Sequence, residues 1–92
     1  NQTDGFDGLA SATGSASPAS VTATTNATGV VVDGVSWETG AATVGANQTQ
    51  RVNNTNAWNI ASSTQAGTDG GVMTWTFGAV PWAACAINVV GK

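Results

Sequence analysis

The sequence predicts an all-β protein, an antiparallel β-sandwich of jelly-roll-like type, and three observations support this prediction. Apart from alanine, strong helix formers are almost absent, with one Glu, one Lys, one Arg and one Leu in 92 residues. Gly, Ser, Thr, Asn and Val dominate instead, which is typical of turns and of β-branched strand surfaces. Turn signals recur about every ten residues, a spacing that fits a sandwich or jelly roll.

The first part of the chain predicts an arm followed by two strands. Residues 1–18 are rich in Gly, Ser, Ala and Asp, and we expect a loop or flexible arm there, ahead of a partial β-sandwich domain at residues 19–92. The β-branched run at residues 19–26 predicts a strand with a polar outer side. Residues 29–37, GVVVDGVSW, form the strongest candidate for a central strand, with Gly34 at a position that allows a bulge.

The middle of the chain predicts two weaker strands. One covers residues 48–52 and is mostly polar. The other covers residues 57–63 and places Trp58 and Ile60 on one side. The Gly-rich segment at residues 65–71 then predicts a turn.

The C-terminal segment predicts a closing pair of strands at residues 71–79 and 82–90. Met73, Trp75 and Phe77 alternate and so face one way, while the second run is almost continuously apolar and predicts burial on both sides. The preceding residues offer few bulky hydrophobic side chains. We therefore expect an incomplete sandwich, six strands in all, that a partner strand or a second fragment completes.

Composition excludes several classes of function. Only seven residues are charged, the net charge is −3 and no basic patch exists, which argues against nucleic-acid binding. No apolar stretch reaches the length of a membrane span. Histidine is absent, and no nucleophile elbow, phosphate-binding loop or Cys-x-x-Cys motif occurs, so no enzymatic activity is predicted. The low charge instead favours self-association.

Three segments carry a resemblance to a known family. They are VVDGV at residues 31–35, ATVGANQTQR at 42–51 and the run TWTFGAVPWAACAI at 74–87. From about residue 17 to residue 90, the chain resembles the C-terminal half of a β-sandwich module found in secreted bacterial and archaeal surface proteins and in some phage structural proteins. The resemblance implies an exported protein with a structural or adhesive role, located outside the cell, at the cell surface or in a virion. It supplies no catalytic residues.

The family domain has about twice this length by domain-size expectation, and its N-terminal half has no counterpart here. The start at Asn1 rather than Met suggests processing of a longer precursor. The resemblance therefore implies a partner, either further copies of the chain or a second fragment of the same precursor.

Carboxylates suggest two sites of different kinds. Asp4 and Asp7, interleaved with glycines, could offer oxygens to Ca²⁺, although a simple Asp/Gly turn is the plainer explanation. No other cofactor is suggested. Asp33 lies in an apolar run, and we interpret it as a structural carboxylate satisfied by backbone amides or by Arg51, rather than as a catalytic acid paired with Glu38.

The tryptophans and the cysteine are candidate binding or assembly residues. Trp58 and then Trp37 are the best candidates for exposed rings that stack on sugars. Cys85 has no internal disulfide partner, and we expect it to be a small buried hydrophobe, with an intermolecular bridge or a reactive thiol as the alternative. The predicted core or assembly residues are Trp75, Trp82, Cys85 and Ile87.

Four Asn-x-Thr sequons occur, and Asn26 and Asn53, in segments expected to turn, are the favoured glycan acceptors.

These features together predict a non-enzymatic structural module of an extracellular surface layer, filament or virion. It would associate by β-strand pairing, because an incomplete sandwich leaves backbone groups open along an edge. The run at residues 82–90 is expected to be covered by the partner or the core. The alternative is a carbohydrate- or surface-binding module that uses an exposed tryptophan.

Overall fold

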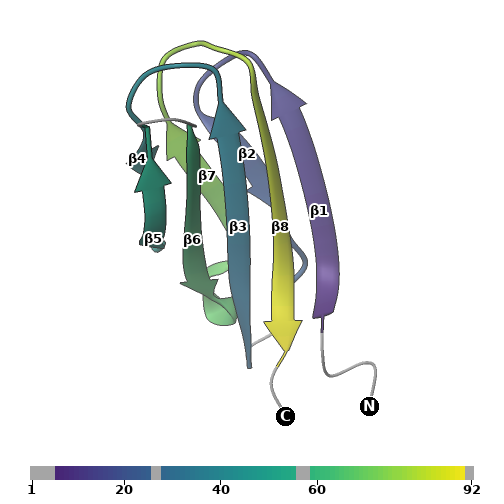
Figure 1. Ribbon diagram of the computed structural model, residues 1–92. Helices are drawn as coiled ribbons and strands as arrows, with labels where there is room; N and C mark the ends of the chain where they lie inside the picture. Colours follow the sequence, from purple (N-terminus) through teal and green to yellow (C-terminus); the bar gives the residue numbers. More distant parts are fainter. Residues whose placement is uncertain (1–5, 26–27, 56–58, 91–92) are drawn as a thin grey trace.

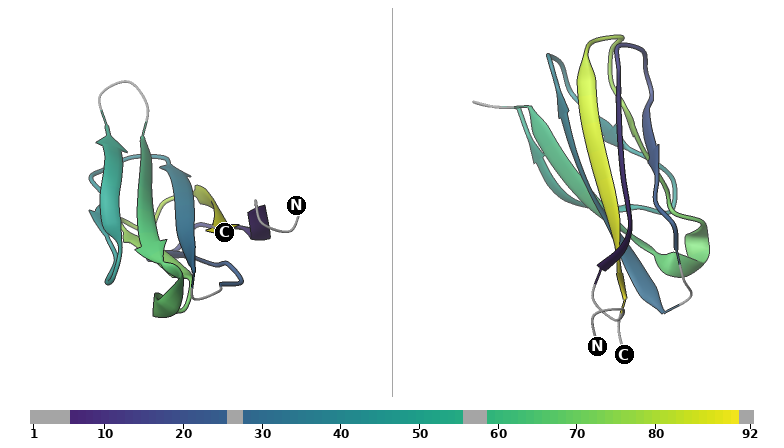
Figure 2. Two further views of the ribbon diagram at one scale, coloured as in Figure 1. Left: turned by 90° about the horizontal axis from the view of Figure 1, so that it is seen from below. Right: turned by 90° about the vertical axis from the view of Figure 1, so that its right-hand side faces the viewer.

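The computed structural model describes residues 6–25, 28–55 and 59–90, and all of their side chains except those of residues 6–8 and 90. It is all-β, with two antiparallel sheets packed as a β-sandwich (Figures 1 and 2). One sheet has five strands in the order β1 (Phe6–Gly14), β8 (Trp82–Val90), β3 (Gly29–Trp37), β6 (Ile60–Ala66) and β5 (Thr49–Asn54). The other has three, in the order β2 (Ala19–Thr22), β7 (Val72–Thr76) and β4 (Thr43–Val44). A short 3-10 helix, η2 (Gly67–Asp69), links β6 to β7.

Strands β3 and β8 form the centre of the larger sheet and have the predicted bounds. They pair along their whole length, from Gly29 opposite Val90 to Trp37 opposite Trp82. Gly34 allows a bulge, but none is present, because the register of β3 with both β8 and β6 continues through Gly34 without a shift. The valines of β3 alternate between buried and exposed positions, as a strand with one face in the core requires.

The N-terminal segment departs from the prediction of a loop or flexible arm. Its residues 6–14 form β1, which pairs with β8 over most of its length, including Ala10 opposite Ala86 and Gly14 opposite Trp82. Gly, Ala and Ser have low strand propensity, so the local signal for a strand is weak here. The small side chains of Ala10 and Ala12 pack against the core, and this tertiary contact outweighs the weak local preference.

The middle strands lie a few residues further along the chain than predicted. Strand β5 covers Thr49–Asn54 and β6 covers Ile60–Ala66, so the end of β6 and η2 occupy much of the segment expected to be a turn. The two-residue strand β4 was not predicted. The part of the chain that the structure describes thus contains eight strands rather than six.

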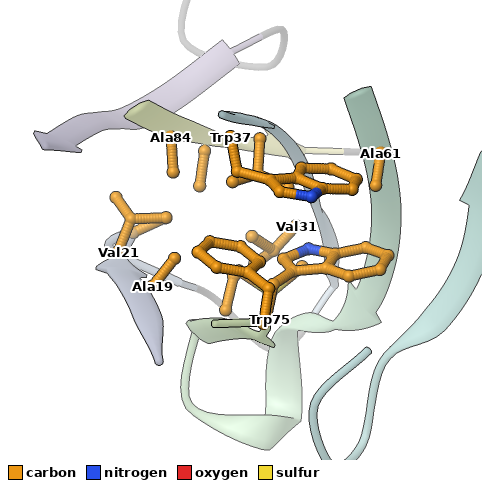
Figure 3. Close-up of a cluster of buried hydrophobic side chains, with 12 residues drawn as sticks. Ala19, Val21, Val31, Trp37, Ala61, Trp75 and Ala84 are labelled. Atoms are coloured by element: carbon orange, nitrogen blue, oxygen red, sulfur yellow. The ribbon is translucent and has the colours of Figure 1, made fainter. Parts of the chain in front are cut away.

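The core is built from a few large side chains packed against alanines. Met73, Trp75 and Phe77 all face inward, as predicted. The ring of Trp37 stacks on that of Phe77, with centroids 5.5 Å apart and planes 8° from parallel. Figure 3 shows Trp37 and Trp75 one above the other between the two sheets. The surrounding small residues are Ala19, Ala23, Ala61, Ala84 and Ala86. They leave room for the aromatic rings, so few bulky residues are needed to pack the two sheets together.

Candidate functional site

A network of hydrogen-bonded polar side chains crosses the interior and begins at Asp33. Oδ1 of this carboxylate accepts hydrogen bonds from the backbone N of Ser63 at 2.6 Å and from Ser63 Oγ at 2.9 Å. Oδ2 accepts one from Trp75 Nε1 at 2.9 Å, which joins the two sheets. The sequence left two kinds of partner open for Asp33, and the backbone amide of Ser63 is one of them. Arg51, the other, instead donates from Nε to Thr64 Oγ1. Ser63 and Thr64 are neighbours in β6 and point to opposite sides of the sheet, so Arg51 lies on the side away from Asp33.

The hydrogen-bond network continues from Ser63 to the second sheet through Gln48. Gln48 Nε2 donates to Ser63 Oγ at 2.8 Å, and Gln48 Oε1 accepts from the backbone N of Thr74 at 2.8 Å. Desolvation by burial raises the pKa of the Asp33 carboxyl, and it outweighs the hydrogen bonds from Trp75 and Ser63, which act in the opposite direction. Because Ser63 is fully buried, its hydroxyl is closed to any substrate. The arrangement is therefore structural, and it ties the two sheets together.

The predicted sugar-stacking residue Trp37 is buried and cannot present a ring face to a ligand. Its Nε1 donates to Gly40 O at 2.6 Å, and its ring is covered by Phe77. This part of the prediction is wrong, because Trp37 ends a strand on the inward side. Trp82 is half-buried and donates from Nε1 to Ala16 O at 2.8 Å. Trp58 lies outside the described residues.

The predicted calcium and glycan sites fall mostly outside the described part of the chain. This holds for Asp4, Asn26 and the side chain of Asp7. Among the described residues no group of three or more His, Cys, Asp or Glu could hold a metal ion. Asn53 lies in β5 rather than in a turn, because β5 extends beyond its predicted end. Its Nδ2 donates to Ala42 O at 2.9 Å and to Gln50 Oε1 at 3.0 Å.

Cys85 is exposed, so its prediction as a buried hydrophobe is wrong. The pleat of β8 explains this, because Ala84 and Ala86 face the core and the residues between and after them face outward. Ile87 shares this outward side and is half-buried. The apolar run of β8 is therefore covered on one side only, and its second side belongs to the solvent-facing surface of the five-stranded sheet, called here the outer face.

The outer face gathers most of the large apolar side chains that the described residues expose. Five of the six lie on it, and the sixth, Val72, lies on the three-stranded sheet. Their positions follow from the strand registers, since each alternates with an inward-facing neighbour. The five are Leu9, Val30, Val32, Val52 and Ile60. Figure 1 is drawn looking onto this face, with β2, β4 and β7 behind.

One end of the outer face is hollowed into an open depression of about 380 Å³. Gly34 is one of the residues that line it, and because Gly34 has no side chain, an added Cβ there would meet no atom within 4 Å. Ser36, Ala83 and Cys85 contribute small side chains, and Ile60 forms one wall. An open apolar hollow of this kind does not enclose a small ligand or bring titratable groups together, as an active site requires.

Sequence reasoning did not identify the outer face as a candidate site. A signal is present, because Val30 and Val32 alternate with Val31 and Asp33, so β3 carries apolar residues on both sides. Such a pattern predicts a central strand, and it does not distinguish cover by the chain itself from cover by another chain. No protein-family model, curated protein or solved structure matches this chain, so the resemblance described above remains a prediction.

Proposed function

We propose that this protein is a non-enzymatic structural module that assembles by covering the outer face of its five-stranded sheet with another polypeptide. The observation that carries the proposal is the concentration of exposed apolar side chains on this one face. Leu9 is 75% exposed, and Val30 and Ile60 are each 44% exposed. Contiguous apolar surface of this kind marks a protein interaction site more often than isolated exposed side chains do.

The distribution of charge supports the same proposal. Among the side chains described on the outer face, only Arg51 is charged, and it lies on the edge strand β5. Asp33 is buried, while Glu38 follows the end of β3 and Asp69 lies in η2. Covering the centre of the outer face therefore desolvates no charge, as in the apolar core of protein interfaces.

Strand pairing at an edge is a second contact of the predicted kind, and the five-stranded sheet has two edge strands, β1 and β5. Strand β1 has nine residues and β5 has six, whereas the edge strands β2 and β4 have only four and two residues. A register shift interrupts each of the two longer edges, between Asp7 and Ala10 in β1 and between Gln50 and Val52 in β5, and such bulges limit edge-to-edge pairing. The outer face is thus the stronger basis for assembly.

The setting of this assembly is proposed from the sequence. It comprises a surface layer, filament, adhesion structure or virion outside the cell, a jelly-roll-like arrangement, and completion by further copies or by a second fragment of the precursor. The alternative of carbohydrate binding has no support among the described tryptophans, since Trp37 and Trp75 are buried and Trp82 is half-buried.

The test compares two lysine substitutions at equally exposed strand valines. Val30, 44% exposed, lies on the outer face, and Val72, 46% exposed, lies on the opposite sheet. We expect the wild-type chain to form a higher-mass species in sedimentation equilibrium. Val30→Lys should abolish this species, because a charge would be buried at the contact, while Val72→Lys should retain it. Near-ultraviolet circular dichroism checks that both variants are folded. Equal loss in both variants, or a wild-type chain that stays monomeric at every concentration, would contradict the proposal.

A further inference from the structure

On its two central strands, the outer face has large side chains at one end and small ones at the other. Along β3, Val30 and Val32 face outward in the first half, and Gly34 and Ser36 in the second half. Strand β8 runs in the opposite direction, and its outward residues follow the reverse order, with Ala83 and Cys85 before Ile87 and Val89.

The register between β3 and β8 places the large residues of one strand beside the large residues of the other, and the small beside the small. Val32 lies opposite Ile87, and Gly34 lies opposite Cys85. The valine and isoleucine side chains thus form one apolar ridge across the two central strands. The depression, which Gly34, Ser36, Ala83 and Cys85 help to line, lies beside this ridge, at the other end of the same two strands.

We propose that a second copy of the chain packs face to face on the outer face, with its strands running in the opposite direction. The two-fold axis of this dimer lies perpendicular to the strands and crosses them at the level of Asp33 and Ala86, which are partners in the register. The pairing rests on the proposed function, because it assigns an occupant to the same surface. It is an isologous contact, in which each ridge enters the depression of the other copy.

The strand registers show that this pairing places large residues against small ones. On β3, Val32 packs against the partner's Gly34, and Val30 packs against the partner's Ser36. The side chains of β8 follow the same rule, because Ile87 meets the partner's Cys85. A two-fold axis parallel to the strands would instead place ridge on ridge and hollow on hollow.

The flanking strands obey the same symmetry. On β6, Ile60 and Ala66 are equally far from Ser63, which lies at the level of the axis opposite Asp33. The axis therefore brings Ile60 against the partner's Ala66. On β1, Ala10 is the register partner of Ala86 and lies at the level of the axis, and Leu9 lies next to it within the register shift of this edge strand.

The area of the face is sufficient for a specific dimer. Its strands have nine, nine, nine, seven and six residues, from β1 across to β5. With a rise of about 3.4 Å per residue and a strand spacing of about 4.8 Å, the face projects to roughly 650 Å². Side-chain relief adds to this projected area, and a standard protein interface covers about 800 Å² on each partner.

Among the side chains that the structure describes, the one charged group near this contact lies at its rim. Arg51 lies near the level of the axis on the edge strand β5, so the two copies bring their Arg51 side chains to the same side of the dimer. The sheet twist separates edge strands in a face-to-face packing, and solvent screens this pair. Raising the NaCl concentration should therefore tighten the dimer slightly.

The decisive experiment first places a larger side chain in the depression and then, in a double variant, restores the packing between the two copies. Gly34→Val adds a side chain where the single chain has open space, and Gly34 has no positive φ, so the variant should fold as well as wild type. In the dimer the added methyl groups meet the partner's Val32, and we expect the dissociation constant from sedimentation equilibrium to rise on the order of tenfold or more. Gly78→Val is the matched control, because Gly78 also has open space around its Cβ position but lies beyond the end of β7.

The double variant Val32→Gly/Gly34→Val exchanges the large and small positions. The axis then places the introduced valine of each copy against the introduced glycine of the other, so the dissociation constant should return to near the wild-type value. Failure of this exchange to restore association, or unchanged association in Gly34→Val, would overturn the antiparallel pairing. If Val30→Lys still abolished assembly in that case, the proposed function would stand without this pairing. A chain that is monomeric at every concentration would overturn both.

Discussion

Replacing Asp33 with asparagine tests whether the buried carboxylate holds the two sheets together. Both carboxylate oxygens accept hydrogen bonds from Ser63 and Trp75, and every one of these partners is a donor. An amide has one oxygen and one NH₂ group, so it accepts on one side only. If its oxygen takes the place of Oδ1, its NH₂ group faces the indole N–H of Trp75, and both donors remain unsatisfied in the core.

The expected loss in the free energy of unfolding follows from these two unsatisfied donors. Leaving a buried donor without a partner costs about 1–3 kcal/mol, and asparagine avoids the desolvation of a buried charge, which offsets part of this. We therefore expect Asp33→Asn to lower the free energy of unfolding by about 2 kcal/mol. At roughly 4–8 °C per kcal/mol for a domain of this size, the midpoint of thermal unfolding falls by about 8–16 °C.

Tryptophan fluorescence during thermal and urea unfolding measures this loss, with Asp69→Asn as the control. Asp69 is an exposed residue of η2, so the same chemical change there should alter stability by no more than a few tenths of a kcal/mol. Equal stability of the two variants would show that the bonds of Asp33 do not stabilise the contact between the sheets.

The difference in stability between wild type and Asp33→Asn should also depend on pH, with a definite sign. Because burial raises the pKa of Asp33 above its ordinary value of 3.8, the folded state binds a proton more tightly than the unfolded chain does. The stability from this proton is fully present below pH 3.8 and is lost as the pH rises through the higher pKa of the folded state. Asparagine does not titrate, so the stability advantage of wild type over Asp33→Asn should be larger near pH 3 than near pH 7. An advantage that grows with pH would mean that the hydrogen bonds outweigh burial.

Two further predictions concern tight contacts inside the sandwich. A Cβ at Gly29 would collide with Oδ1 of the buried Asn88, so Gly29→Ala should destabilise the fold by about 2 kcal/mol, and Asn88→Ala in the same chain should remove most of that effect. Additive losses in chemical unfolding would contradict this coupling. Gln48→Ala leaves the backbone N of Thr74 without its acceptor and should cost about 1–3 kcal/mol, against a negligible change for the exposed neighbour Thr49→Ala. Matching midpoints for these two variants would show that Gln48 is dispensable.

The elements that could be predicted are those whose local pattern agrees with their tertiary environment. Strands β3 and β8 have the bounds expected from the sequence, because β-branched or apolar residues fill them and turn residues flank them. The inward direction of Met73, Trp75 and Phe77 is predictable for the same reason, since strict alternation fixes one face of a strand.

The remaining features depend on contacts that no local pattern encodes. Strand β1 has the composition of a loop and is held by its ladder with β8. The partners of Asp33 could not be chosen from sequence, because Ser63 and Trp75 are 30 and 42 residues away along the chain. Trp37 precedes a turn, which is compatible with exposure, but the register of β3 places it on the inward side.

Strand β8 shows why one sequence prediction was wrong for the single chain and still bears on function. Its apolar run predicted burial on both sides, whereas the structure covers only the side of Ala84 and Ala86. The side with Cys85 and Ile87 retains the composition of a buried strand, although Cys85 is exposed and Ile87 only half-buried within the described part of the chain. In the proposed dimer this second side is buried against the same strand of the partner. The apolar pattern of β8 is then explained by burial in the dimer rather than in the single chain. Gly34→Val should change only the dimer, so it distinguishes this explanation from an apolar surface that has no partner.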